Sequence, residues 1–107
     1  MGHIEKCADK IGQLVKRLET FESFKRNWIE QDSMLRNFEI MGEAANHISN
    51  ATKERFPEVE WFKIRGMRNL VAQEYFGVRL ETIWETATVN VPILHKRIQE
   101  IIEDMEP

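Results

Sequence analysis

The sequence predicts an all-α protein, built as an up-and-down bundle of four to five helices. Apolar residues recur every three or four positions along most of the chain, which is the spacing of one helix face. Charged residues make up 31% of the chain and fill the opposite faces, and no stretch alternates apolar and polar residues as a half-buried strand does. A chain of 107 residues is expected to form one domain, residues 1–107.

The first helix is expected over residues 3–21 and the second over residues 31–49. The apolar stripe of the first helix consists of Ile4, Cys7, Ile11, Leu14 and Leu18. The stripe of the second consists of Met34, Leu35, Phe38, Met41, Ala45 and Ile48. Ser23 is expected to cap a short connecting turn between them. Gly42, in the second helix, is small enough to let another helix approach closely.

The third helix is expected over residues 63–76, after a connection at residues 49–57 and a short turn through residues 59–62. Gly77 can adopt the left-handed conformation on which helices often end. The last helix is expected to begin near Leu80, and Pro92 predicts a kink or break near Asn90, because proline lacks a helical donor. The last apolar stripe contains Ile83, Trp84, Ala87, Val91, Ile93, Leu94, Ile98, Ile101 and Ile102.

Composition narrows the class of protein. The formal net charge of −3 does not indicate a nucleic-acid-binding protein, so such a role requires a local concentration of positive charge. The single cysteine, Cys7, lies on an apolar stripe and is expected to pack in the core. No apolar run is long enough to span a membrane, and the N-terminus does not read as a signal peptide, so we expect a soluble, cytoplasmic protein.

Three polar residues follow one another at one-turn spacing on the second helix: Glu39, Glu43 and His47. A solvated or interface face is the simpler interpretation of this spacing. Contact of Glu43 and His47 with a cation is the alternative, but no third ligand lies nearby in the sequence. We therefore expect no metal site and no bound cofactor.

Positive charge is concentrated around the third helix. Between residues 63 and 79 only Glu74 is acidic, against the four basic residues Lys63, Arg65, Arg68 and Arg79. Such a strip, together with Tyr75, could hold a phosphate backbone and stack a base. The alternative is that Arg68 pairs with a carboxylate, Glu39 or Glu43, and that Tyr75 is an aromatic residue at the edge of the core.

Helical geometry separates the functional candidates. At about 100° per residue, Arg68 and Tyr75 lie within about 20° of each other, whereas Gln73 lies about 140° from Arg68. One helix cannot easily direct Arg68 and Gln73 to the same point. They would have to meet across a groove, most simply one shared with a second copy of the chain about a two-fold axis.

Several short motifs are distributed over nearly the whole chain: RNFEIMGEA at residues 36–44, GMRN at residues 66–69, EYFGV at residues 74–78 and PIL at residues 92–94. Together they resemble the HepT-like ribonuclease toxins of the HEPN superfamily, which are encoded beside a minimal nucleotidyltransferase antitoxin. The resemblance implies a homodimer whose third helices line a basic cleft, and metal-independent cleavage of RNA there. It also implies that the antitoxin silences the toxin by transferring AMP to a tyrosine.

The family motif is Arg, four residues, His, one residue and Tyr. By position Arg68 matches its Arg and Tyr75 its Tyr, whereas Gln73 replaces the His. In metal-free cleavage a 2′-hydroxyl attacks the adjacent phosphorus, and imidazole can exchange the necessary proton near neutral pH whereas a carboxamide cannot. Arg68 can still stabilise the phosphorane charge. The resemblance thus implies catalytic positions at Arg68, Gln73 and Tyr75, with AMP on Tyr75, and RNA bound by the basic residues Lys63, Arg65, Arg68 and Arg79.

Two interpretations of function follow from Gln73. The first is a ribonuclease toxin that this substitution weakens or inactivates. The alternative is a HEPN-type module that binds RNA, nucleotides or a partner protein without chemistry, and a plain helical interaction protein is a third. The remaining imidazoles of the chain, His3, His47 and His95, all lie outside the third helix.

Overall fold

Helices make up the protein, as the sequence predicted. The structure, a computed structural model, describes residues 1–74 and 80–105, and residues 70–74 by their backbone alone. Every regular element in these ranges is helical. In chain order they are α1 (Gly2–Leu18), α2 (Phe21–Arg26), α3 (Trp28–Asn46), α4 (Asn50–Arg55), α5 (Trp61–Glu74), α6 (Leu80–Glu85), a π-helical turn (Thr86–Asn90) and α7 (Val91–Met105). None of these helices has the length and apolar character needed to cross a membrane.

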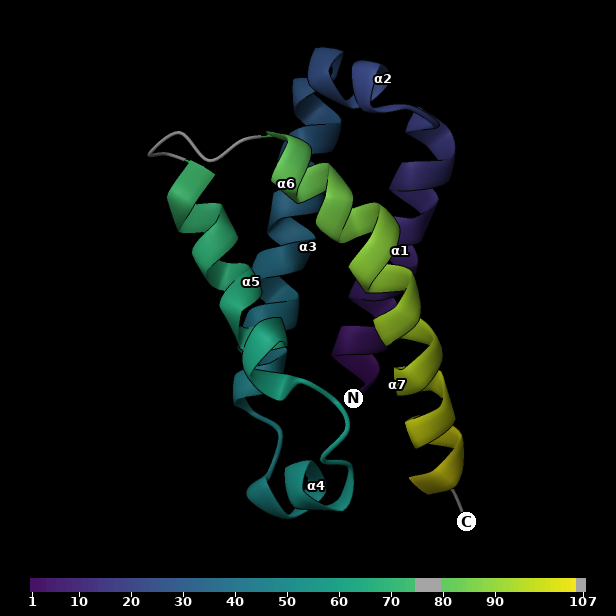
Figure 1. Cartoon of the computed structure of the whole chain (residues 1–107), viewed down its shortest axis with the longest axis vertical. Coiled ribbons are helices and arrows are strands. Elements are labelled where there is room, and N and C mark those ends of the chain that lie inside the picture. Colours follow the sequence, from purple (N-terminus) through teal and green to yellow (C-terminus); the bar gives the residue numbers. More distant parts are fainter. Residues whose placement is uncertain (75–79, 106–107) are drawn as a thin grey trace.

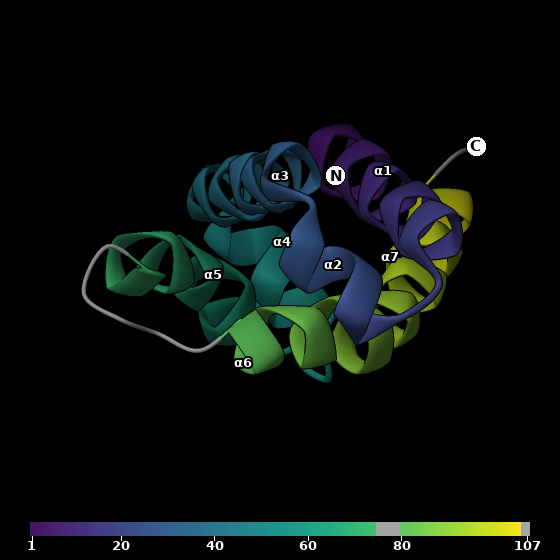
Figure 2. The same cartoon turned by 90° about the horizontal axis from the view of Figure 1, so that it is seen from above.

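Four long helical segments run alternately up and down, which confirms the predicted bundle (Figure 1). They are α1, α3, α5 and the continuous run from α6 through α7. Helix α3 packs between α1 and α5, and α7 packs along α1. The view from above shows α5 beside α3 at one side of the bundle, with α1 and α7 at the other (Figure 2). The short helices α2 and α4 lie at opposite ends (Figure 1).

The predicted apolar stripes form the core. Their buried members are Ile4, Cys7, Ile11, Leu18, Met34, Leu35, Phe38, Met41, Ala45, Ile83, Ala87, Val91, Ile98 and Ile101. Burial raises the pKa of the Cys7 thiol, an effect that nearby Lys10 only partly opposes, so Cys7 behaves as a core residue as predicted. The prediction was wrong for Ile93, which is 70% exposed. Val91, Leu94 and Ile98 supply the inward spacing of α7, and Ile93 lies about 200° around the helix from Val91.

The first connection is more ordered than predicted. Helix α1 ends at Leu18 rather than at residue 21, because Glu19 adopts a positive φ of 66° that interrupts the helix. Helix α2 follows at once, where only a turn was expected. Its cap is Thr20, whose hydroxyl accepts from the Ser23 amide at 3.1 Å, so the predicted cap at Ser23 was wrong.

The second connection also contains a helix that the sequence pattern did not predict. Helix α3 ends at Asn46 instead of Ser49, and Ser49 caps α4 by accepting from the Thr52 amide at 3.1 Å. Helix α5 begins at Trp61, two residues before the expected start. Its predicted end at residue 76, and Gly77 after it, lie outside the described residues.

The predicted irregularity near Asn90 is a π-helical turn over Thr86–Asn90. Pro92 follows it in the first turn of α7 and has no N–H to donate to the carbonyl one turn earlier. The Thr86 hydroxyl donates to the Thr82 carbonyl at 2.8 Å, and the Thr88 hydroxyl to the Trp84 carbonyl at 2.9 Å. The helix therefore continues through the proline with one wider turn instead of breaking.

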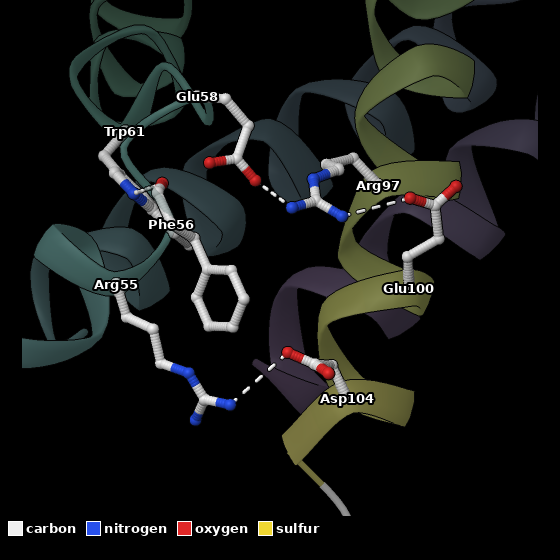
Figure 3. Close-up of polar contacts among 7 residues, drawn as sticks. All are labelled: Arg55, Phe56, Glu58, Trp61, Arg97, Glu100 and Asp104. Carbon is white, nitrogen blue, oxygen red and sulfur yellow. Dashed lines mark hydrogen bonds and ion pairs between the residues drawn. The ribbon is translucent and has the colours of Figure 1, made fainter.

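Polar contacts tie the segment before α5 to α7 (Figure 3). Arg97 pairs with Glu58 before α5 and with Glu100 one turn along α7, the latter at 3.1 Å. Arg55 of α4 pairs with Asp104 of α7 at 3.3 Å. Glu100 and Asp104, two acidic residues of α7, are thus engaged in ion pairs. These contacts connect α4 and the segment before α5 to α7.

Candidate nucleic-acid interface

Helices α3 and α5 approach each other very closely at Gly42. A Cβ atom at this position would lie 2.4 Å from Cγ of Arg68 and 3.2 Å from the carbonyl oxygen of Arg65. Both distances are shorter than normal contacts, so any larger residue would displace the Arg68 side chain or α5. The predicted role of Gly42 is confirmed, and the residue that its small size admits is Arg68, the predicted catalytic arginine.

Arg68 forms an ion pair across this close contact. Its Nη1 lies 2.8 Å from Oε2 of Glu43, the residue that follows Gly42 on α3. The alternative interpretation from the sequence, pairing with Glu39 or Glu43, is confirmed for Glu43. The pair is not dry, since the side chains are 50% and 49% exposed. Such an exposed pair contributes at most about 1 kcal/mol, so an anionic ligand can compete with Glu43 for the guanidinium.

The other oxygen of Glu43 faces an imidazole. Nε2 of His47 lies 3.5 Å from Oε1 of Glu43, one turn away on α3. Glu39 instead pairs with Arg36, at 3.4 Å. Among the described residues, no group of three acidic, histidine or cysteine side chains is arranged to hold a metal ion. Glu43 therefore connects an arginine of α5 to a histidine at the end of α3.

The basic strip of α5 is partly neutralised. Lys63 pairs with Glu60 at 2.6 Å and Arg68 with Glu43, whereas Arg65 lies exposed on α5. Three predicted site residues cannot be placed: the side chain of Gln73, and Tyr75 and Arg79 entirely, lie outside the described residues. The structure thus shows Lys63, Arg65 and Arg68 along one helix, with Arg68 paired to Glu43 of α3.

The three histidines lie in different environments. His3 is exposed in the first turn of α1. His95, on α7, contacts Glu5 of α1, with 3.1 Å between its Nε2 and Oε1 of Glu5. His47 shares a carboxylate with Arg68. The one-turn spacing of Glu43 and His47 was visible in the sequence, but their connection to Arg68 depends on how α5 packs against α3.

A groove separates the first turns of α5 from the π-helical turn and α7. Its volume is about 680 Å³. Phe62 and Ile93, at 68% and 70% exposed, lie along it. The other lining residues are Glu58, Val59, Glu60, Lys63, Ile64, Gly66, Met67, Thr86, Asn90, Leu94 and Arg97. Its charged residues pair among themselves, Lys63 with Glu60 and Arg97 with Glu58, which leaves a face that is apolar and nearly neutral.

The bundle and the Arg68–Glu43–His47 cluster define a small all-helical domain with an exposed, charged site on the α3–α5 pair. The sequence matches the family model described as "Ribonuclease HepT-like" over residues 4–101, which is most of the chain. The chain belongs to this ribonuclease HepT-like family, as its motifs indicated.

Named relatives agree with this assignment. "Putative RNase TTE0752" of Caldanaerobacter subterraneus subsp. tengcongensis is 32% identical over 103 residues, covering 94% of this chain and 92% of the relative. "Putative RNase MJ1216" of Methanocaldococcus jannaschii is 34% identical, covering 92% and 80%. "Probable ribonuclease HepT" of Thermococcus cleftensis is 28% identical, covering 87% and 93%. No solved structure matches the chain.

Proposed function

We propose that this chain is the toxin of a toxin–antitoxin pair and acts as a metal-independent endoribonuclease. Arg68 carries this proposal: it occupies the arginine position of the family motif and its guanidinium is half exposed beside Glu43. The names of the relatives, which describe ribonucleases, support RNA as the substrate. Arg65, exposed on the same helix, extends the positive charge along which a phosphate backbone would lie.

The proposed chemistry uses the 2′-hydroxyl of the RNA itself. The 2′-oxygen gives up its proton and bonds to the adjacent phosphorus, and the bond from phosphorus to the 5′-oxygen breaks as that oxygen takes up a proton. Arg68 leaves Glu43, binds a non-bridging phosphate oxygen and stabilises the charge that develops on the phosphorane. This exchange of partners costs little free energy because the resting Arg68–Glu43 pair is exposed to water. Gln73 can hold the phosphate by hydrogen bonds but cannot transfer a proton, so slow cleavage is expected.

Loss of Arg68 tests the ribonuclease proposal. We expect Arg68→Ala to lower the rate of RNA cleavage about 10²-fold, because it removes the charge that stabilises the transition state. The measurement is cleavage of a labelled RNA in the presence of a chelator. Arg17→Ala is the matched control, since Arg17 also pairs with a glutamate, Glu30, but lies on α1. Equal activity of the two variants would contradict the proposal.

A non-catalytic function is the second candidate, and Gln73 is the observation that favours it. Binding of RNA, nucleotides or a partner protein survives the loss of a titrating group, whereas rapid cleavage does not. The same experiment separates the two functions. RNA that the native chain binds in a salt-dependent manner but leaves intact would support the binding module.

We infer that the RNA-binding cleft lies between two copies of the chain. The groove beside α5 supports this, because Phe62 and Ile93 expose large apolar surfaces there. Its ion pairs are satisfied within the protomer, so the groove offers little net charge to a nucleic acid. A second copy of the same chain can cover such a face about a two-fold axis without leaving unpaired charges.

A substitution that places a charged side chain in the groove tests whether the chain forms a homodimer there. Ile93→Glu is expected to weaken dimerisation at least about 10²-fold, because each protomer would bury an unpaired carboxylate. Ile29→Glu is the control: Ile29 is a comparably exposed isoleucine, at 61%, on α3 and outside the groove. Sedimentation velocity should show a monomer for the first variant and a dimer for the control. A native chain that is already monomeric would refute the shared cleft.

The proposed antitoxin partner is a minimal nucleotidyltransferase that attaches AMP to Tyr75. Tyr75 follows α5 in the sequence, seven residues after Arg68. We expect co-expression with such an enzyme, encoded beside this chain, to increase the intact mass by whole AMP units, and Tyr75→Phe to abolish the increase. An unchanged mass of the native chain after co-expression would count against regulation by AMP transfer.

A further inference from the structure

Glu43 contacts two side chains at once, those of Arg68 and His47, and this arrangement suggests a role for His47. Its Oε2 lies 2.8 Å from Nη1 of Arg68, and its Oε1 lies 3.5 Å from Nε2 of His47. The imidazole of His47 therefore lies one carboxylate away from the arginine that would bind the scissile phosphate. It is also accessible, because the side chain of His47 is 76% exposed.

We propose that His47 supplies the proton transfer that Gln73 cannot, so that this chain has moved its imidazole from α5 to the end of α3. The inference rests on the proposed ribonuclease function. When the proton of the neutral ring is on Nε2, the atom that lies 3.5 Å from Oε1 of Glu43, the Nδ1 atom of His47 carries the lone pair and can act as a base. A carboxylate behind an imidazole orients the ring and stabilises the imidazolium that forms, as in other acid–base sites.

In the proposed step His47 is the base, and water protonates the leaving group. Nδ1 of His47 takes the proton of the 2′-hydroxyl while the 2′-oxygen bonds to phosphorus. The bond from phosphorus to the 5′-oxygen breaks, and water protonates the leaving 5′-oxygen. The products are a 2′,3′-cyclic phosphate and a 5′-hydroxyl end. The imidazolium then returns its proton to water, and Arg68 pairs again with Glu43.

Several structural features favour His47 over the other imidazoles. His95 is mostly buried between α7 and α1 with Glu5 as its partner, and these helices form the far side of the bundle from α5 (Figure 2). His3 lies in the first turn of α1 and has no connection to Arg68 through the ion pairs of the described residues. His47 ends α3 as its C-terminal cap residue, so its backbone is fixed by the helix while its ring remains exposed.

The test replaces the imidazole and then supplies it from solution. His47→Ala is expected to lower kcat for RNA cleavage about 10²-fold with little change in KM, because the residue transfers a proton and does not bind the backbone. Free imidazole in the buffer is expected to restore part of the lost rate in His47→Ala but not in Arg68→Ala. His3→Ala serves as the control, since it removes an exposed histidine elsewhere.

The outcomes separate this inference from the proposed function. An unchanged kcat in His47→Ala, or a lower kcat that imidazole does not restore, would overturn the role of His47 alone. A native chain that does not cleave RNA, beside a Gln73→His variant that does, would also overturn only this inference, because His47 would then be unable to replace the motif histidine. Absence of cleavage by both proteins would overturn the ribonuclease function and this inference with it.

Discussion

Gln73→His is expected to increase the rate of RNA cleavage by roughly 10²- to 10⁴-fold, the range that general acid–base catalysis contributes. The substitution restores an imidazole at the histidine position of the family motif, five residues after Arg68. If His47 already accepts the 2′-hydroxyl proton, a histidine at position 73 can protonate the leaving 5′-oxygen, so both transfers would have a protein partner. The measurement is the single-turnover rate on a labelled RNA with a chelator present.

The control for this gain is Gln13→His, the same substitution at a glutamine of α1 whose amide pairs with Asp9 at 2.7 Å. It adds an imidazole to the surface without placing it near Arg68, and the cleavage rate is expected to stay at the native level. The pH profile gives a second readout. A general base and a general acid that both titrate produce a bell-shaped dependence of rate on pH. A bell-shaped profile should therefore appear only in Gln73→His. If Gln73→His cleaves RNA no faster than the native chain, position 73 plays no part in catalysis.

Gly42→Ala is expected to destabilise the fold by about 1–3 kcal/mol, although alanine is intrinsically the better helix former by about 1 kcal/mol. The added Cβ would lie 2.4 Å from Cγ of Arg68 and 3.2 Å from the Arg65 carbonyl, so the Arg68 side chain or α5 itself must shift. That movement also separates Arg68 from Glu43. The variant is therefore expected to lose most of its RNA cleavage as well as stability, which urea denaturation and the cleavage assay would measure.

Gly12→Ala is the matched control for this prediction. Gly12 also lies within a long helix, α1, but nothing lies within 4 Å of a Cβ at that position. The same substitution should there stabilise the protein by about 0.5–1 kcal/mol through helix propensity alone. Opposite shifts of the two urea midpoints would isolate the α3–α5 contact as the cause. Shifts of the same sign and size would show that the close approach at Gly42 carries no strain.

Most of the fold could be predicted from local patterns. The stripe Met34, Phe38, Met41 and Ala45 identified α3 because burial repeats with the helical period. The short helices α2 and α4 were not predicted, since six residues are too few for a period to be recognised. Their capping residues Thr20 and Ser49 were the available signals for a helix start. Serine and threonine are so common in connections that neither residue alone predicts a helix.

The candidate site was predicted only in part. Arg68 was identified from its motif and Gly42 from its size, while the meeting of these two residues was not foreseen. Ile93 was assigned to the core because it is apolar and adjacent to core positions, and its exposure depends on how α7 is rotated after the π-helical turn. The positive charge along α5 was also overestimated. Glu60 pairs with Lys63 three residues later, and the packing of α5 against α3 brings Glu43 to Arg68.

By itself, the sequence determined the helical class, the long helices, the core position of Cys7 and the family, because each of these depends on residue spacing along the chain. Only the tertiary structure decided that Glu43 joins Arg68 to His47, since that contact depends on the distance between α3 and α5. That distance is set by the missing side chain of Gly42, and a spacing pattern along one helix contains no information about how closely the next helix approaches.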